Sequence, residues 1–167
     1  PIILCNTDQS VLVAAIETLY LEKLEKINQI TNNLKFEIAI TNRRAKVLKA
    51  RIYNESVTRL AIKDQVDIEL LQAIADPSRD LDYPFKGPFY SEREGNFEIA
   101  AVSISLCKKA RLLPASILIE IPKSIKEKLV SSQISESDIR HLEFKNDNAN
   151  FLPTLSTAQL PIKGHQN

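Results

Sequence analysis

The sequence predicts an α/β (α+β) domain in which a mixed sheet is flanked by helices. Segments with strand-like alternation and segments with helical periodicity follow one another along the chain, as is typical of a sheet with helices packed on it. Of the 167 residues, 44% are hydrophobic and 26% are charged, which is ordinary for a globular protein. A chain of this length can bury one core, so we expect a single domain.

The first third of the chain predicts a strand pair, a helix, a strand and a second helix. Residues 1–6 and 10–16 are rich in Val, Ile and Leu and flank the turn-like N-T-D-Q, which indicates two strands. The helix after them ends at Asn32-Asn33, and its expected buried face consists of Tyr20, Leu24, Ile27 and Thr31. Residues 34–40 alternate as a strand, and Thr41 or Asn42 is expected to cap the next helix.

The remaining elements are expected as follows. Residues 57–63 favour a strand, and residues 68–75 favour a helix that Asp76-Pro77 ends. Residues 76–95 are predicted to be an irregular stretch, and a buried strand is expected over 115–121. Between them a long helix over 97–112 has an expected buried stripe of Ile99, Val102, Leu106 and Ala110.

Toward the end of the chain we expect two short helices, an edge strand and a linker. The capping-box spacing pairs Ser124 with Glu127, and Ser135 with Asp138. We therefore assign 1–152 to the domain and 153–167 to an edge segment and linker. The chain contains no Met and opens inside an apparent strand, so we expect it to be a segment of a longer protein.

Charge and cysteine content exclude several function classes. The 22 basic and 21 acidic residues nearly balance, so nothing favours nucleic acid or a membrane as a partner. No apolar run reaches the ~18 residues of a membrane span. We interpret Cys5 and Cys107 as reduced, buried thiols of a cytoplasmic protein, with a disulfide between them as the alternative.

The sequence contains no intact catalytic, cofactor-binding or metal-binding motif. The two histidines, His141 and His165, have no Cys or Glu at metal-ligand spacing, so we expect no metal. With three glycines there is neither G-x-G-x-x-G nor a phosphate-binding loop, so we expect no cofactor.

Two basic or mixed clusters could still carry chemistry. Arg43-Arg44 lies where a strand leads into a helix and could meet an anionic ligand, or could form a solvated first turn. Arg93, Glu94 and Glu98 lie where the irregular stretch leads into the long helix. They could provide a carboxylate base or a salt-bridged helix start.

Glu120 is the most informative single position. It lies near the end of the expected buried strand, where ligands gather in open α/β sheets. A buried acid is rarely left unpaired, so we expect either a structural ion pair or residual ligand binding.

Several motifs together resemble one family. Residues 95–121, G-N-F-E-I-A-A-V-S-I-S-L-C-K-K-A-R-L-L-P-A-S-I-L-I-E-I, resemble the active-site region of 3,4-dihydroxy-2-butanone 4-phosphate synthase. Residues 1–17 look like its first hairpin, which in that family carries an acidic loop. Five further motifs resemble the N-terminal domain of the two-domain GTP cyclohydrolase II proteins of proteobacteria. They occupy residues 41–45, 75–81, 86–89, 108–115 and 153–162.

Departures from the synthase pattern matter as much as the matches. In place of the acidic loop this chain has N-T-D-Q-S, which retains only Asp8. Asn96, Phe97 and Ile119 replace the His, Thr and Cys of the family pattern. The positions that match are Arg93, Gly95, Glu98 and Glu120. The resemblance therefore implies the synthase fold with most of its chemistry lost, and with Arg93, Glu98 and Glu120 as vestigial site residues.

Three functional hypotheses follow. The first is a non-catalytic synthase-like domain that assists assembly or supports a GTP cyclohydrolase II domain of the same chain, to which the zinc would belong. The second is a divergent enzyme on ribulose 5-phosphate, and the third is an unrelated α/β ligand-binding module. The resemblance also implies a homodimer, and we expect the apolar side chains of the irregular stretch at its interface: Leu81, Tyr83, Phe85, Phe89 and Tyr90.

Overall fold

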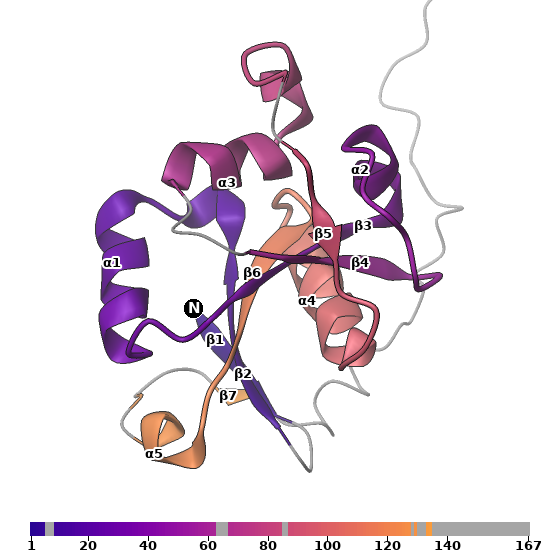
Figure 1. Ribbon diagram of the computed structural model, residues 1–167. Coiled ribbons are helices and arrows are strands. Elements are labelled where there is room, and N and C mark those ends of the chain that lie inside the picture. The colour runs from indigo at the N-terminus through magenta and orange to yellow at the C-terminus, as the bar shows by residue number, and fades with distance from the viewer. Residues whose placement is uncertain (6–8, 63–66, 85–86, 128, 130–132, 135–167) are drawn as a thin grey trace, which may run out of the picture.

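The strands of the described residues form a seven-stranded sheet. The computed structural model describes residues 1–5, 9–62, 67–84, 87–127, 129 and 133–134. The strands are β1 (Ile2–Cys5), β2 (Ser10–Ala15), β3 (Glu37–Thr41), β4 (Val57–Ala61), β5 (Tyr90–Ser91), β6 (Ala115–Glu120) and β7 (Gln133–Ile134). Their order in the sheet is β5-β4-β3-β6-β2-β1-β7 (Figure 1). All neighbours are antiparallel except β1 and β7, which are parallel. The predicted mixed sheet is thus confirmed.

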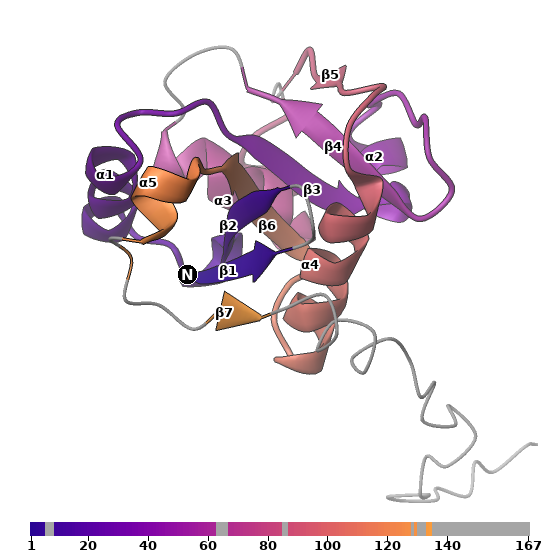
Figure 2. The ribbon, with the colours of Figure 1, turned by 90° about the horizontal axis from the view of Figure 1, so that it is seen from below.

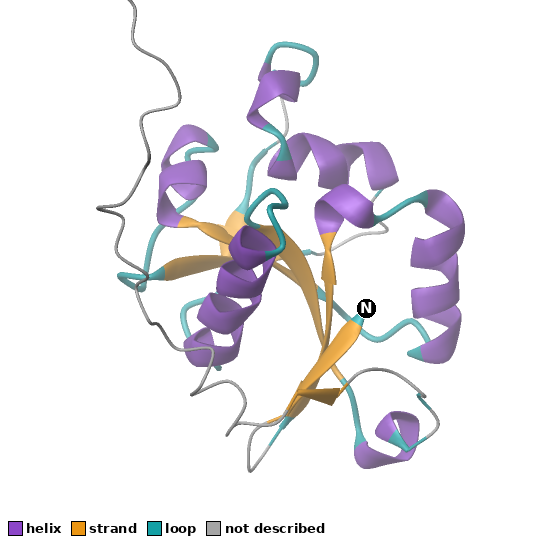
Figure 3. Ribbon diagram, turned by 180° about the vertical axis from the view of Figure 1, so that it is seen from behind, coloured by secondary structure: helices purple, strands orange, loops and turns teal. Residues whose placement is uncertain are grey.

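Helices cover both faces of this sheet. They are α1 (Leu21–Ile30), α2 (Asn42–Val47), α3 (Ile68–Ala75), α4 (Phe97–Lys109) and α5 (Lys123–Lys126), with short 3-10 helices η1 (Ile16–Thr18) and η2 (Pro77–Asp80). From below, α1 and α5 lie on one side of the sheet and α4 on the other (Figure 2). From behind, α4 lies in front of the strands (Figure 3). None of the helices in the described part of the chain combines the length and the apolar character of a membrane-spanning segment.

Strand alternation divides the core into two clusters, one on each face. In β6, Ile117 and Ile119 belong to the cluster beneath α1 and α3, whereas Leu118 belongs to the cluster beneath α4. Ile117 and Ile119 are 1% and 0% exposed, and Leu118 on the opposite face is 6% exposed. The strand is therefore buried on both faces, as the sequence predicts.

Several local predictions are confirmed. The first two strands pair as a hairpin in the register Ile2↔Val13. Thr41 caps α2, because its hydroxyl accepts the Arg44 N–H at 3.2 Å. Asn32 and Asn33 follow α1 with φ values of 52° and 54°, the left-handed conformation that Asn adopts more readily than most residues.

The buried stripe of α4 differs from the prediction. Ile99 and Val102 are buried, but Leu106 is half-buried and Ala110 is the exposed C-cap. The face toward the sheet also carries Ala100, Ser103, Ile104 and Cys107. The buried Ser103 hydroxyl lies 2.8 Å from that of Ser116 on β6, and this polar contact lets a serine occupy an apolar face.

Three other local predictions need correction. Helix α5 begins at Lys123 after Pro122, without a side-chain cap, so Ser124 lies inside the helix and the Ser124–Glu127 capping box is wrong. Tyr20 is 57% exposed because it is the extended N-cap residue of α1 and precedes its helical period. The stretch 76–95 is not wholly irregular, since it contains η2 and β5. The predicted Ser135–Asp138 helix, the 153–167 segment, Asp8, Phe85, His141 and His165 lie outside the described residues.

Candidate functional site

A polar cavity of about 250 Å³ opens at one end of the sheet, where the N-terminus of α4 meets β2, β3, β4 and β6. The ends of three strands, the middle of β4 and the start of one helix meet there, so residues far apart in the sequence share one wall. Its lining residues are Gln9, Val11, Lys35, Glu37, Arg59, Gly95, Asn96, Ile99, Leu118 and Glu120. The cavity thus contains Glu120 and the two residues at the start of the family-like segment, Gly95 and Asn96.

Arg59 of β4 is the most strongly held charge in this wall. Its Nε donates to Oε2 of Glu37 at 2.8 Å, and its Nη2 lies 2.5 Å from the same oxygen. The two side chains are diagonal neighbours on one face, since Arg59 is paired with Ala39, two residues from Glu37. Arg59 Nη1 donates to the Glu94 carbonyl at 2.8 Å, and the guanidinium lies 5.3 Å from the centre of the Phe97 ring.

Gly95 is required by the close approach of Arg59. Its φ is +105°, a conformation that side-chain-bearing residues rarely adopt. A Cβ at this position would lie 2.4 Å from Nη1 of Arg59. The glycine therefore allows the guanidinium to sit against the backbone at the entrance to α4.

Asn96 acts as the N-cap of α4. Its Oδ1 accepts the Ile99 N–H at 3.0 Å, and its Nδ2 donates to Oε1 of Gln9 at 3.4 Å. Asn96, which stands where the synthase pattern has a histidine, thus caps α4 and links the helix start to Gln9 on the opposite wall of the cavity.

Glu120 is not the buried acid that the sequence predicts, because its side chain is exposed at the cavity. It is the last residue of β6 and pairs with Val11 near the start of β2, so it lies at the margin of the sheet. Within the described part of the chain, no side chain donates a hydrogen bond or forms an ion pair with its carboxylate. The expected structural pairing is therefore absent there.

Arg93, Glu94 and Glu98 are exposed and do not line the cavity. Among the described residues they form no ion pair, so the predicted salt-bridged helix start is wrong. Of the three, only Glu94 contacts a residue of the wall, because its backbone carbonyl accepts a hydrogen bond from Arg59. Of the three vestigial candidates Arg93, Glu98 and Glu120, only Glu120 lines this cavity.

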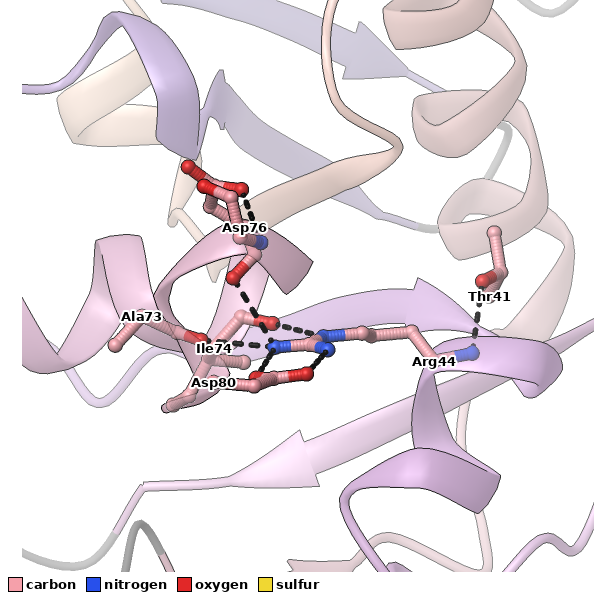
Figure 4. Close-up of polar contacts among 7 residues, drawn as sticks. Thr41, Arg44, Ala73, Ile74, Asp76 and Asp80 are labelled. Atoms are coloured by element: carbon pink, nitrogen blue, oxygen red, sulfur yellow. Dashed lines mark hydrogen bonds and ion pairs between the residues drawn. The ribbon is translucent and has the colours of Figure 1, made fainter. Parts of the chain in front are cut away.

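Arg44 is a buried structural residue, neither solvated nor open to an anionic ligand (Figure 4). Its Nε donates to the Ile74 carbonyl at 2.7 Å and its Nη2 to the Ala73 carbonyl at 2.9 Å, both near the C-terminus of α3. Two further bonds of 2.7 Å join the guanidinium to both oxygens of Asp80 in η2. Of the predicted pair, only Arg43 is exposed.

A second cavity, of about 490 Å³, lies between α2 and the segment after η2. Its lining consists mostly of apolar, aromatic and proline residues. Its residues are Val47, Leu48, Lys49, Asp80, Tyr83, Pro84, Gly87, Pro88 and Phe89. It offers fewer convergent polar groups than the first cavity, which remains the better candidate site.

Neither cysteine lines either of these two cavities. Cys5 and Cys107 are both free thiols, and Cys107 is buried whereas Cys5 is half-buried. Burial raises the pKa of the Cys107 thiol to about 11, so it stays protonated at neutral pH. Within the described ranges, no three His, Cys, Asp or Glu side chains are grouped so as to hold a metal ion.

Sequence reasoning missed the charged residues of this wall that lie in β3, in β4 and just before β3. Lys35 contributes an ammonium 3.5 Å from Oε1 of Glu92, and Glu37 and Arg59 form the ion pair described above. The sequence does contain a signal, since Lys35 and Glu37 share the polar side of an alternating strand. Only the antiparallel register of β3 and β4 reveals Arg59 as their neighbour.

Comparison with known proteins gives similarity in structure but not in sequence. No family model matches the chain, and no curated protein matches it. A cation-free 3,4-dihydroxy-2-butanone 4-phosphate synthase is 12% identical with a TM-score of 0.58, covering 85% of this chain and 90% of that one. A synthase in complex with two magnesium ions is also 12% identical, with a TM-score of 0.56 over 85% and 90% of the two chains. RibBX, a two-domain synthase from A. baumannii, is 15% identical with a TM-score of 0.63 over 84% of this chain and 53% of that one. The chain therefore has the fold of 3,4-dihydroxy-2-butanone 4-phosphate synthase.

Proposed function

We propose that this chain is a non-catalytic, synthase-like domain of a cytoplasmic riboflavin biosynthesis protein from a proteobacterium. Its role is to support or assemble a GTP cyclohydrolase II domain of the same chain. One observation carries the proposal: the Asn96 amide and the Arg59 guanidinium, which line the cavity, are engaged in structural bonds. Asn96 caps α4, and Arg59 is bound to Glu37 and to the backbone.

The donor set of the cavity supports loss of the synthase reaction. One synthase of this fold is described in complex with two magnesium ions. Magnesium prefers oxygen ligands, usually including one or two carboxylates. Of the two carboxylates that line the cavity, Glu37 is bound to Arg59 and only Glu120 is exposed. The described residues of this wall therefore do not match a site for two divalent ions.

A turnover assay tests the proposal directly. The chain is incubated with ribulose 5-phosphate and Mg²⁺, and formate is followed by proton NMR, with an active synthase as positive control and heat-denatured chain as blank. We expect formate at the level of the blank. Formate above the blank that disappears in Asn96→Ala or Glu120→Gln would instead establish the alternative, a divergent enzyme on ribulose 5-phosphate.

The assembly role implies a homodimer, for which two exposed side chains offer a surface. Leu81 is 92% exposed and Tyr90 is 52% exposed, both on the stretch between α3 and α4. Sedimentation at low micromolar concentration should show twice the chain mass of 18.8 kDa, and a stable interface buries roughly 800 Å² per partner. The double variant Leu81→Ser/Tyr90→Ser should sediment as a folded monomer, whereas Ile30→Ser on α1 should not change the mass. Wild-type protein that sediments only as a monomer contradicts the proposal.

The zinc of the proposed protein is assigned to the GTP cyclohydrolase II domain. Metal analysis of this chain after purification without chelators should therefore find zinc far below one ion per chain. Stoichiometric zinc bound by this chain would contradict the assignment.

A further inference from the structure

The face around the 490 Å³ cavity has a basic side and an acidic side. Residues 42–54, which comprise α2 and the chain after it, contain five cations and no acid, and the first acid after them is Glu55. Residues 67–84, which contain α3 and η2, carry five acids and one cation. The Arg44–Asp80 ion pair joins the two sides, so four cations remain on the first and an excess of three acids on the second. Both sides lie at the same end of the molecule (Figure 1).

The four remaining cations have no structural task in the described part of the chain. Arg43, Lys46, Lys49 and Arg51 are exposed, and none of them forms an ion pair there. Arg43 lies in the first turn of α2, where a positive charge opposes the helix dipole, and Lys46 follows it by three residues, a spacing at which like charges repel. An acidic partner surface would relieve both effects.

Leu81 lies between two acids and has no cover. It is 92% exposed, and the next residue, Asp82, is also exposed. Asp80 and Tyr83, on either side of these two residues, line the cavity, but Leu81 does not enter it. The chain therefore presents an uncovered leucine and a free-standing acid beside a cavity that it does not fill itself.

The cavity is suited to an apolar side chain. Val47, 59% exposed, lies on its α2 side, and Pro84, Pro88 and the Phe89 ring contribute to the other walls. Its volume of about 490 Å³ is within the ~300–1,000 Å³ of ligand pockets and exceeds the space that one leucine side chain needs. Lys49 is the member of the basic side that lines it.

We propose that this face is the contact between two copies of the chain, related by a two-fold axis. Leu81 of each copy enters the 490 Å³ cavity of the other, and Asp82 meets the basic side there, beside Lys49. A two-fold axis brings the acidic side of each copy onto the basic side of the other, so every contact occurs twice. This inference rests on the homodimer proposed above and identifies its interface. The described residues favour a second copy as occupant because they present the required leucine with an adjacent acid.

Two charge reversals that are mixed together test this reciprocal contact. In Asp82→Lys alone, and in Lys49→Glu alone, like charges face each other twice, so each variant should dimerise roughly tenfold more weakly than wild type. In an equimolar mixture, the introduced lysine faces the introduced glutamate, while the native Asp82 of one chain faces the native Lys49 of the other. Native mass spectrometry and sedimentation should therefore show a heterodimer that forms more readily than either variant's homodimer. Glu25→Lys, an exposed reversal on α1, is the control and should leave dimerisation unchanged.

Leu81→Ser separates the apolar contact from the charges. It should weaken the dimer on the order of a hundredfold, because the burial of one leucine is lost in each of two equivalent contacts. Circular dichroism should show an unchanged fold, since Leu81 is exposed within its own chain. A wild-type dimer that is insensitive to these substitutions, or reversals whose mixture forms no heterodimer, would overturn this interface and leave the homodimer to another surface. A monomeric wild type would overturn the homodimer as well, whereas the non-catalytic role is decided separately by the turnover assay.

Discussion

Replacing Arg44 by Met should cause a large loss of stability for a single polar substitution. The guanidinium connects three elements, since it extends from α2 to carbonyls at the end of α3 and to Asp80 in η2 (Figure 4). Methionine keeps the apolar stem but cannot donate a hydrogen bond. The variant therefore leaves the Ile74 and Ala73 carbonyls and the Asp80 carboxylate without this donor.

The magnitude follows from the burial of the pair. The Arg44 side chain is 8% exposed and that of Asp80 is 31% exposed, so water can rehydrate the acid better than the carbonyls. Removing one partner of a buried ion pair costs about 3–5 kcal/mol. For a chain of this size, 1 kcal/mol shifts the midpoint of thermal unfolding by about 2–4 °C, so the expected decrease is about 6–20 °C.

Urea and thermal unfolding followed by circular dichroism measure this loss. Arg43→Met is the matched control, because Arg43 is the exposed neighbour, and it should stay within about 0.5 kcal/mol of wild type. Arg44→Lys should recover little, since an ammonium cannot form the bidentate contact with Asp80. If Arg44→Met unfolds within about 0.5 kcal/mol of wild type, the structural role assigned to the guanidinium is wrong.

Three further predictions concern the cavity and the core. Gly95→Ala should destabilise the fold by about 1–3 kcal/mol in urea unfolding, because the positive φ of Gly95 and its contact with Arg59 both oppose a Cβ. Gly87→Ala is the control and should have little effect, since its Cβ would lie 3.4 Å from the nearest atom, the backbone nitrogen of Phe89. Asn96→Ala should lower the free energy of unfolding by about 1 kcal/mol because α4 loses its N-cap, whereas Asn96→Asp, which can still accept the Ile99 N–H, should retain most of the cap's contribution. Equal melting temperatures for wild type and both variants would contradict the capping role of Asn96. Burial raises the folded-state pKa of Cys107 from its ordinary value of 9.0 to about 11, so the stability that the buried thiol contributes is present below pH 9 and lost as the pH rises toward 11. The free energy of unfolding in urea, measured at about pH 8 and about pH 10.5, should be lower at the higher pH in wild type. The decrease should be smaller in Cys107→Ala, which has no thiol to titrate.

Elements defined by local patterns were predictable from the sequence. The hairpin of β1 and β2, the Thr41 cap and the end of α3 before Pro77 depend on residues close together in the chain. Each has a short-range physical cause: alternation, a hydroxyl that accepts an N–H, and the restriction that proline places on the residue before it. The fold class followed from these elements and from the family-like motifs.

The candidate site was less predictable because it depends on contacts between distant residues. Glu120 appears buried in sequence because β6 is apolar, yet it occupies the end of the strand beside Val11. The Arg59–Glu37 pair forms through the register of β3 and β4, which the sequence does not specify. The role of Arg44 is hidden for the same reason, since its partners Ala73, Ile74 and Asp80 lie 29–36 residues away.

The position of β6 constrains the order in which this chain can fold. β6 lies between β3 and β2, so residues 115–120 provide the hydrogen bonds that connect the hairpin of β1 and β2 to the pair formed by β3 and β4. During synthesis, these two strand pairs emerge first and cannot complete a common sheet until β6 has left the ribosome. Closure of the sheet is therefore a late, long-range event, of the kind that slows folding. A chain truncated before Ala115 should expose the edges of β2 and β3 and aggregate.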